Sequence, residues 1–123
     1  MRFSSPDFEQ LVSQALDSLP EWVQEYMNNV VIIVEPWPNT NQLQAAEIPL
    51  GNTLLGLYQG IPLTHRGRGY QLAPPDRISL FQGPLESFAD NELALTQLIR
   101  RTVIHEIAHH FGFSEAKLRE LDY

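Results

Sequence analysis

Two histidines and a glutamate stand close together near the end of the chain, in the segment His105-Glu106-Ile107-Ala108-His109. If this segment is helical, His105 and His109 lie one turn apart on the same face. Two neutral imidazoles at that spacing can both bind one zinc ion. Glu106 lies about 100° further round the helix, where its carboxylate can reach a metal-activated water without binding the metal. The spacing therefore predicts a hydrolytic zinc centre with Glu106 as general base.

The residues before this motif favour a helix. Residues 91–104 are rich in helix-forming types and contain neither Gly nor Pro. Asp90 can serve as the N-cap, and Gly112 as the residue just beyond the last turn. We therefore expect a helix over roughly residues 90–111, with the motif in its last two turns.

The two histidines lie beside the expected core face of this helix. At about 100° per residue, one arc collects the apolar residues Ile99, Val103, Ile104, Ile107, Ala108 and Phe111. His105 and His109 fall outside it, next to Leu98 and Thr102. The alternative is a pair of surface or core-edge histidines, but a shuffled sequence would contain the motif only about once in 100. His110 points about 100° away from His109, so we expect it to be partly buried or to support the site without binding the same metal.

The chain continues with Gly112 and Glu115, three residues apart. Metzincins have the frame H-E-x-x-H-x-x-G-x-x-H, in which a left-handed glycine turns the third ligand back to the metal. Glu115 occupies the third-ligand position, and a carboxylate oxygen is an acceptable zinc ligand. We therefore predict that His105, His109 and Glu115 bind one Zn²⁺.

Glu115 has a second interpretation. Ser114 can cap a short last helix, and an acid in its first turn suits the helix dipole. Glu120 and Asp122 are then the alternative carboxylate ligands. The methionine-containing turn of metzincins is absent, because both methionines of the chain precede the motif. A gluzincin arrangement, with its Glu on a separate downstream helix, has little room either. The sequence therefore predicts a minimal zincin that is a standard member of neither group.

The composition is that of an acidic globular protein without disulfides. The 123 residues are enough for one domain, residues 1–123, with a hydrophobic core. Because there is no cysteine, imidazole and carboxylate groups must hold any metal. The net charge of −7 argues against nucleic acid as a partner, and the longest apolar run, 30–34, is too short to span a bilayer. The start of the sequence lacks the apolar stretch of a secretory signal, so we expect a cytoplasmic protein that binds no membrane. The oligomeric state stays open.

Basic and aromatic residues gather in a long segment, residues 60–76, that we expect to be a loop. It and the residue after it contain His65, Arg66, Arg68, Tyr70 and Arg77. Such a segment is usually solvated surface; alternatively, it forms a flap over a substrate cleft. In the second case Tyr58, His65 or an arginine such as Arg66 would stabilise the oxyanion of the reaction.

Strands precede the long helix, which favours an α+β fold. The expected elements are a helix capped by Ser5 with Pro6 at its first position and ended by Pro20, a helix from Glu21 to about Asn28, a buried strand over 30–34, a polar loop over 36–53, and strands over 54–59 and 77–82. We expect a small sheet of three to four strands packed against the long helix, with helices at the N-terminus and a short helix at the C-terminus.

Gly56 removes a side chain from the second expected strand. Such a position can mark close approach by another backbone. If this strand lies at the sheet edge, an extended peptide could pair with it. Gly56 and Tyr58 are therefore candidate substrate-binding residues, together with His65 and Arg66.

These residues together resemble the small bacterial zincin-like metallopeptidases, sometimes called minimal zincins. Residues 105–115 and 118–121 carry the resemblance most specifically, and residues 11–20, 55–64 and 75–78 extend it. It implies a zincin-like α+β fold, zinc on His105 and His109, Glu106 as the catalytic carboxylate, and an acid, here Glu115, at the third-ligand position.

The resulting hypothesis is a zinc-dependent metallopeptidase acting on a peptide or protein substrate. Zinc would polarise the scissile carbonyl and acidify its bound water. Glu106 would take the proton from that water and pass it to the leaving amine. Two alternatives are a zinc hydrolase of another bond, such as an RNA phosphodiester, and a zinc-binding interaction module without turnover.

Overall fold

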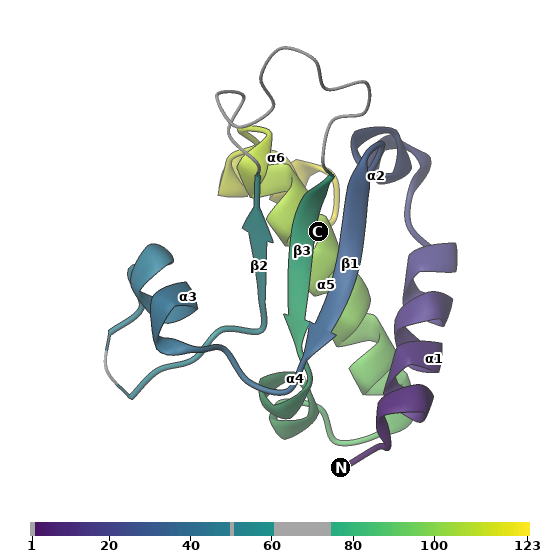
Figure 1. The fold of residues 1–123 in the computed structure, drawn as a ribbon. Coiled ribbons are helices and arrows are strands. Elements are labelled where there is room, and N and C mark those ends of the chain that lie inside the picture. The colour runs from purple at the N-terminus through teal and green to yellow at the C-terminus, as the bar shows by residue number, and fades with distance from the viewer. Residues whose placement is uncertain (1, 50, 61–74) are drawn as a thin grey trace, which may run out of the picture.

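A three-stranded mixed sheet lies against the long helix α5 (Figure 1). The computed structural model describes residues 2–49, 51–60 and 75–123. Its elements are α1 (Ser5–Asp17), α2 (Glu21–Tyr26), β1 (Val30–Glu35), α3 (Thr40–Ala45), β2 (Gly56–Gln59), β3 (Asp76–Phe81), α4 (Gln82–Ser87), α5 (Glu92–His110) and α6 (Glu115–Glu120). The mixed helices and strands confirm the α+β class and the long helix that the sequence predicts.

The strand order is β1-β3-β2, so the last strand in the sequence lies in the middle of the sheet. β1 runs parallel to β3, with Ile32 opposite Ile78, and β2 runs antiparallel to β3, with Tyr58 opposite the same Ile78. In the part of the chain that the structure describes, β2 is therefore an edge strand.

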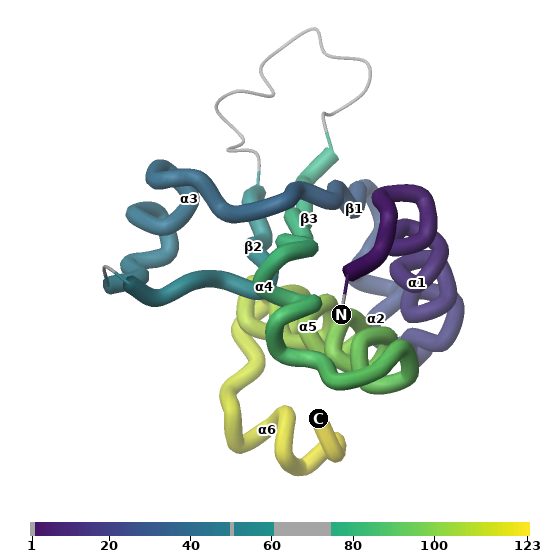
Figure 2. Tube along the Cα trace, turned by 90° about the horizontal axis from the view of Figure 1, so that it is seen from below, coloured from purple at the N-terminus to yellow at the C-terminus, as the bar shows by residue number. Residues whose placement is uncertain are grey.

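The helices α1, α2 and α5 lie on one side of the sheet, and α6 lies farther from it, beyond α5 (Figure 2). Side chains alternate along a strand, so Ile78 and Leu80 of β3 point to the same face, and both are fully buried. The core residues of α5 that are fully buried are Leu95, Ile99, Val103, Ile104, Ile107 and Ala108. The apolar arc predicted for this helix is thus its core face, except that Phe111, expected in it, is 42% exposed. Phe111 follows the last helical residue, where the chain leaves the core.

Two helices begin one residue away from the expected position. Ser4, and not Ser5, caps α1 by accepting a hydrogen bond from the N–H of Asp7. Asn91, and not Asp90, caps α5 by accepting one from the N–H of Ala94. In both places two capping residue types are adjacent, and only the geometry of the first turn decides between them.

The segment 36–53, expected to be a loop, contains the helix α3. Asn39 caps it, and Gln42 at the third helical position reaches back to the N–H of Asn39. This reciprocal pair is a capping box, and an Asn followed three residues later by Gln is its sequence signature. The signature was therefore present in the sequence, although the surrounding prolines and asparagines favoured a loop.

The strand β1 is less buried than its apolar sequence suggests. Val31 is 41% exposed, and the residues Ile32, Ile33 and Val34 are only partly buried. A strand at the edge of the described sheet, with helices on one face, leaves part of its other face to solvent. No helix among the described residues is long and apolar enough to cross a membrane.

Candidate metal centre

His105 and His109 lie in the last two turns of α5, on the side of the helix next to Leu98 and Thr102. The rings of the two histidines are 5.7 Å apart between centroids. His105 is partly buried, whereas His109 is exposed. Both imidazoles therefore face one region at the edge of the core, as their spacing on a helix predicts.

Glu115 joins the two histidines at the start of α6. Its Oε1 atom lies 2.6 Å from Nε2 of His109. Nitrogen or oxygen atoms of His105, His109 and Glu115 all lie within 4.8 Å of one another, so these three residues could hold one metal ion. The turn before α6 brings them together, because Gly112 has a φ of 88°, in the left-handed region that glycine adopts easily.

The position of Glu115 is compatible with both of its interpretations, as a metal ligand and as an acid in the first turn of a helix. Ser114 caps α6 by accepting a hydrogen bond from the N–H of Lys117, so Glu115 is in the first turn. The alternative ligands Glu120 and Asp122 are outside the group of three. The carboxylate of Glu120 lies 3.7 Å from Nζ of Lys117 instead.

Glu106 lies beside the two histidines, outside the three-residue group, and contacts the edge strand. Its Oε1 atom accepts a hydrogen bond of 2.9 Å from the backbone N–H of Tyr58 in β2. Burial raises the pKa of the Glu106 carboxyl, while the Tyr58 N–H and the nearby His109 and His105 act in the opposite direction. Its other oxygen, Oε2, makes no hydrogen bond with the described residues, and Glu106 is among the residues that line the groove described below.

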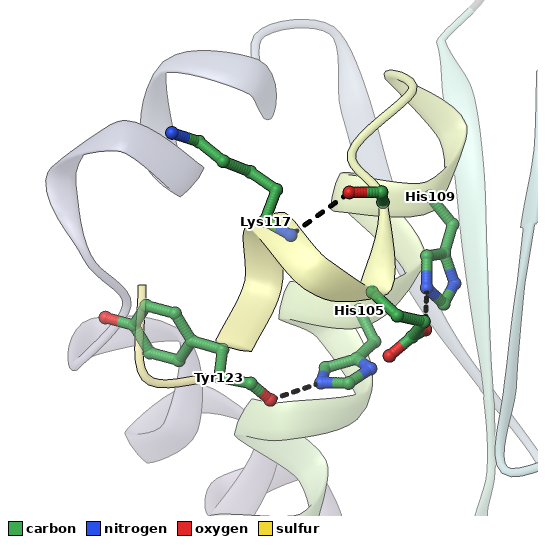
Figure 3. A network of polar contacts seen from close by, with 6 residues as sticks. His105, His109, Lys117 and Tyr123 are labelled. Atoms are coloured by element: carbon green, nitrogen blue, oxygen red, sulfur yellow. Dashed lines mark hydrogen bonds and ion pairs between the residues drawn. The ribbon is translucent and has the colours of Figure 1, made fainter. Parts of the chain in front are cut away.

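A contact that the sequence did not reveal involves the backbone of Tyr123. Its oxygen lies 2.8 Å from Nε2 of His105 (Figure 3). A backbone oxygen can only accept a hydrogen bond, so Nε2 of His105 donates it. The ring of Tyr123 packs against Trp22 and lies beneath the guanidinium of Arg100. No local sequence pattern signals this contact, because it depends on how α6 returns toward α2 and α5.

His110 was expected to be partly buried or to support the site, and the first of these expectations is wrong. It is exposed, not partly buried, and its ring stacks on Tyr58 with 3.8 Å between ring centroids. The Tyr58 hydroxyl donates a 2.7 Å hydrogen bond to Asp76. The hydroxyl is therefore directed to β3, whereas the Tyr58 backbone contacts Glu106.

Gly56 marks a close approach of helix to strand. A Cβ atom at this position would lie 2.8 Å from Cγ2 of Thr102 and 3.2 Å from the backbone oxygen of Ser79. The absent side chain thus lets α5 lie against β2. His65 and Arg66, the other candidate substrate-binding residues, lie outside the described residues.

A groove of about 390 Å³ runs along α5 beside the two histidines. Its lining residues are Thr53, Leu54, Leu55, Gly56, Leu98, Arg101, Thr102, His105, Glu106 and His109. A cavity of about 440 Å³ lies elsewhere, between the residues after β1 and the helix α4, and it contains none of the three potential ligands. We assign the chemistry to the smaller groove, because His105, Glu106 and His109 all line it.

Comparison with known proteins identifies a family and a similar fold. The family model of zincin-like metallopeptidases matches residues 27–123, which include all described strands, α5 and α6. The solved structure of a conserved hypothetical protein from Thermus thermophilus has a similar fold, with a TM-score of 0.54 and 20% sequence identity over 88% of this chain and 94% of that chain. At that identity the similarity concerns the fold alone. None of the curated proteins matches the chain.

Proposed function

The chain belongs to the zincin-like metallopeptidase family, and from this premise we propose that it hydrolyses peptide bonds at a zinc ion bound by His105, His109 and Glu115. The observation that carries the proposal is the convergence of these three residues. Two of them come from one helix, and the third comes from the start of the next.

The donor set fits zinc. Two imidazoles and a carboxylate are common zinc ligands, and a set of three protein ligands leaves a fourth position open, as catalytic sites require. Cysteine, the usual ligand of closed structural sites, is absent from the chain. Bound zinc would supply a Lewis acid that polarises a carbonyl group and lowers the pKa of water.

Glu106 is the proton carrier in this proposal. Its carboxylate is next to the two histidines but outside the group of three, which suits a base and not a ligand. The Tyr58 N–H holds Oε1 in place, so Oε2 can accept a proton from water and pass it to the leaving amine. A raised pKa favours this role, because a stronger base takes a proton more readily.

The edge strand β2 offers a binding surface for an extended peptide. The backbone oxygen of Leu55 accepts a hydrogen bond from Phe81 of β3, and the N–H of Tyr58 points to Glu106. Because the backbone groups of successive residues alternate in direction, Gly56 faces the same way as Tyr58, toward the groove. A substrate could pair with this edge and place its scissile bond near the histidines.

Peptide hydrolysis by the zinc-loaded protein tests the proposal. Mass spectrometry of a mixed peptide library should reveal cleavage by the wild type and a loss of about 10²–10⁴-fold in Glu106→Gln. Glu106→Gln should still bind about one zinc per chain, and so should the control variant His110→Ala. Failure of the zinc-loaded wild type to cleave any peptide would leave a zinc-binding module as the better description. Loss of zinc in Glu106→Gln would make Glu106 a ligand.

A further inference from the structure

Arg101 lies at the rim of the groove, one helical turn before His105. The walls between them are mostly apolar and include Leu54, Leu55 and Leu98. Among the groove-lining residues of the described chain, Arg101 is the only Lys or Arg. The groove therefore combines apolar walls with one cationic residue, one helical turn before His105.

The guanidinium of Arg101 is available to a ligand. The residue is exposed, and its side chain makes no hydrogen bond or ion pair with any residue that the structure describes. Its helical neighbour Arg100 differs, because it donates to the backbone oxygen of Ser18 and lies over the ring of Tyr123. Of the two adjacent arginines, only Arg101 lines the groove.

The charge balance of the groove favours an anionic group beside Arg101. The carboxylates of Glu106 and Glu115 would balance the charge of a divalent ion at the histidines. Among the residues that the structure describes, the positive charge of Arg101 then has no compensating partner, although the whole chain carries a net charge of −7. Solvent ions screen the field of the distant acidic residues. An unpaired cation in the groove therefore selects an anionic ligand mainly by direct pairing.

We propose that the groove selects peptides that have an apolar side chain near the scissile bond and a carboxylate placed so that it can pair with Arg101. This inference rests on the proposed peptidase function and names its substrate class. Four residues along a helix rise about 6 Å, and two residues of an extended peptide span about 6.6 Å. The carboxylate should therefore belong to a residue about two positions from the scissile bond. It can be an Asp or Glu side chain or the free C-terminus of a short peptide.

Two measurements test this selection. In the first, zinc-loaded wild type cleaves peptides that differ only by Glu, Gln or Lys at each position around one Leu, with free or amidated C-termini. In the second, fluorescence anisotropy reports binding of the same peptides to Glu106→Gln, which needs no turnover. We expect a preference of about twofold to fivefold for the carboxylate at one position, weaker at high salt. The free and amidated peptides show which source of carboxylate is recognised.

Charge variants of Arg101 identify the residue responsible. Arg101→Gln should remove the preference, and Arg101→Glu should reverse it in favour of Lys. The control Arg2→Gln removes the same charge near the N-terminus, at the end of the molecule opposite α6 (Figure 1), and should keep the preference. Cleavage with no preference for a carboxylate, or a preference that survives Arg101→Glu, would overturn the inference and leave the peptidase function intact. Absence of cleavage by the wild type together with absence of binding to Glu106→Gln would overturn both the inference and the peptidase function.

Discussion

The backbone oxygen of Tyr123 accepts a hydrogen bond from Nε2 of His105 over 2.8 Å. In a neutral imidazole with its proton on Nε2, the remaining lone pair is on Nδ1. The bond partner of one ring nitrogen thus decides which nitrogen can bind a metal. Tyr123 is outside the group of three potential ligands, and it contacts one of them, His105.

We predict that His105 binds zinc through Nδ1 while Nε2 keeps its proton. Long-range ¹H–¹⁵N spectra of protein labelled at histidine distinguish the two nitrogens directly. Zinc on Nε2 of His105 would contradict the prediction and would mean that the bond to Tyr123 breaks on metal binding.

A second prediction concerns the ring of Tyr123. Tyr123→Ala removes the contacts with Trp22 and Arg100 that hold this residue in place. We expect the zinc Kd to rise by about tenfold, the lower end of the effect of losing the outer partner of a ligand. Tyr123→Phe keeps the ring and should bind zinc like the wild type. Equal Kd values for the Ala and Phe variants would show that the ring does not position His105.

Glu115→Ala should weaken zinc binding by at least about tenfold, because a lost ligand costs no less than a lost outer partner. Glu120→Ala removes a carboxylate from the same helix that pairs with Lys117. It should leave the zinc Kd unchanged. Competition with a chromophoric chelator measures both values, and the opposite ranking would assign Glu120 to the metal.

Gly112 and Gly51 offer a matched pair of substitutions. Both have positive φ, 88° and 87°, and at neither position would an added Cβ meet another atom within 4 Å. Valine at either position should lower the free energy of unfolding by about 1–3 kcal/mol through backbone strain alone. Only Gly112→Val should also raise the zinc Kd, since Gly112 turns the chain from the histidines to Glu115. Urea denaturation and zinc titration of both variants check this, and equal zinc affinities would refute the role of the turn.

Gly56→Ala should destabilise the fold by about 1–3 kcal/mol, because its Cβ would overlap Cγ2 of Thr102. Thr102→Ser removes that methyl group and keeps a hydroxyl that can donate to the backbone oxygen of Leu98. In urea denaturation the double variant should recover part of the loss. Recovery will be incomplete, since the backbone oxygen of Ser79 is also close, at 3.2 Å. If the effects of the two substitutions on the free energy of unfolding simply add, α5 and β2 can move apart at this point.

The sequence predicted most about elements that local geometry determines. His105, Glu106 and His109 lie on a single helix, which fixes the directions of their side chains. Their residue types and spacing were therefore enough to predict that the two imidazoles share one face. The left-handed conformation of Gly112 followed in the same way from one residue and its frame. These features need no knowledge of the remaining chain.

Contacts between distant segments were not predictable in this way. The bond between His105 and Tyr123 and the position of Arg101 beside residues 53–56 arise from tertiary packing. The helix α4 was missed for a local reason. Gly83 and Pro84 usually end a helix, but here they lie in its first turn, where proline is tolerated.

The placement of β3 between β1 and β2 has a consequence for the newly made chain. Among the described residues β1 pairs with residues 76–81 alone, so residues 30–35 have no described strand partner until those residues have been synthesised. The unpaired segment contains Val-Val-Ile-Ile-Val. Uncharged, β-branched runs of this kind aggregate by pairing with the same segment of other chains. During synthesis, the helices α1 and α2 are the elements that can cover it first. Conditions that slow translation between β1 and β3 should therefore promote aggregation more than conditions that slow it after α4.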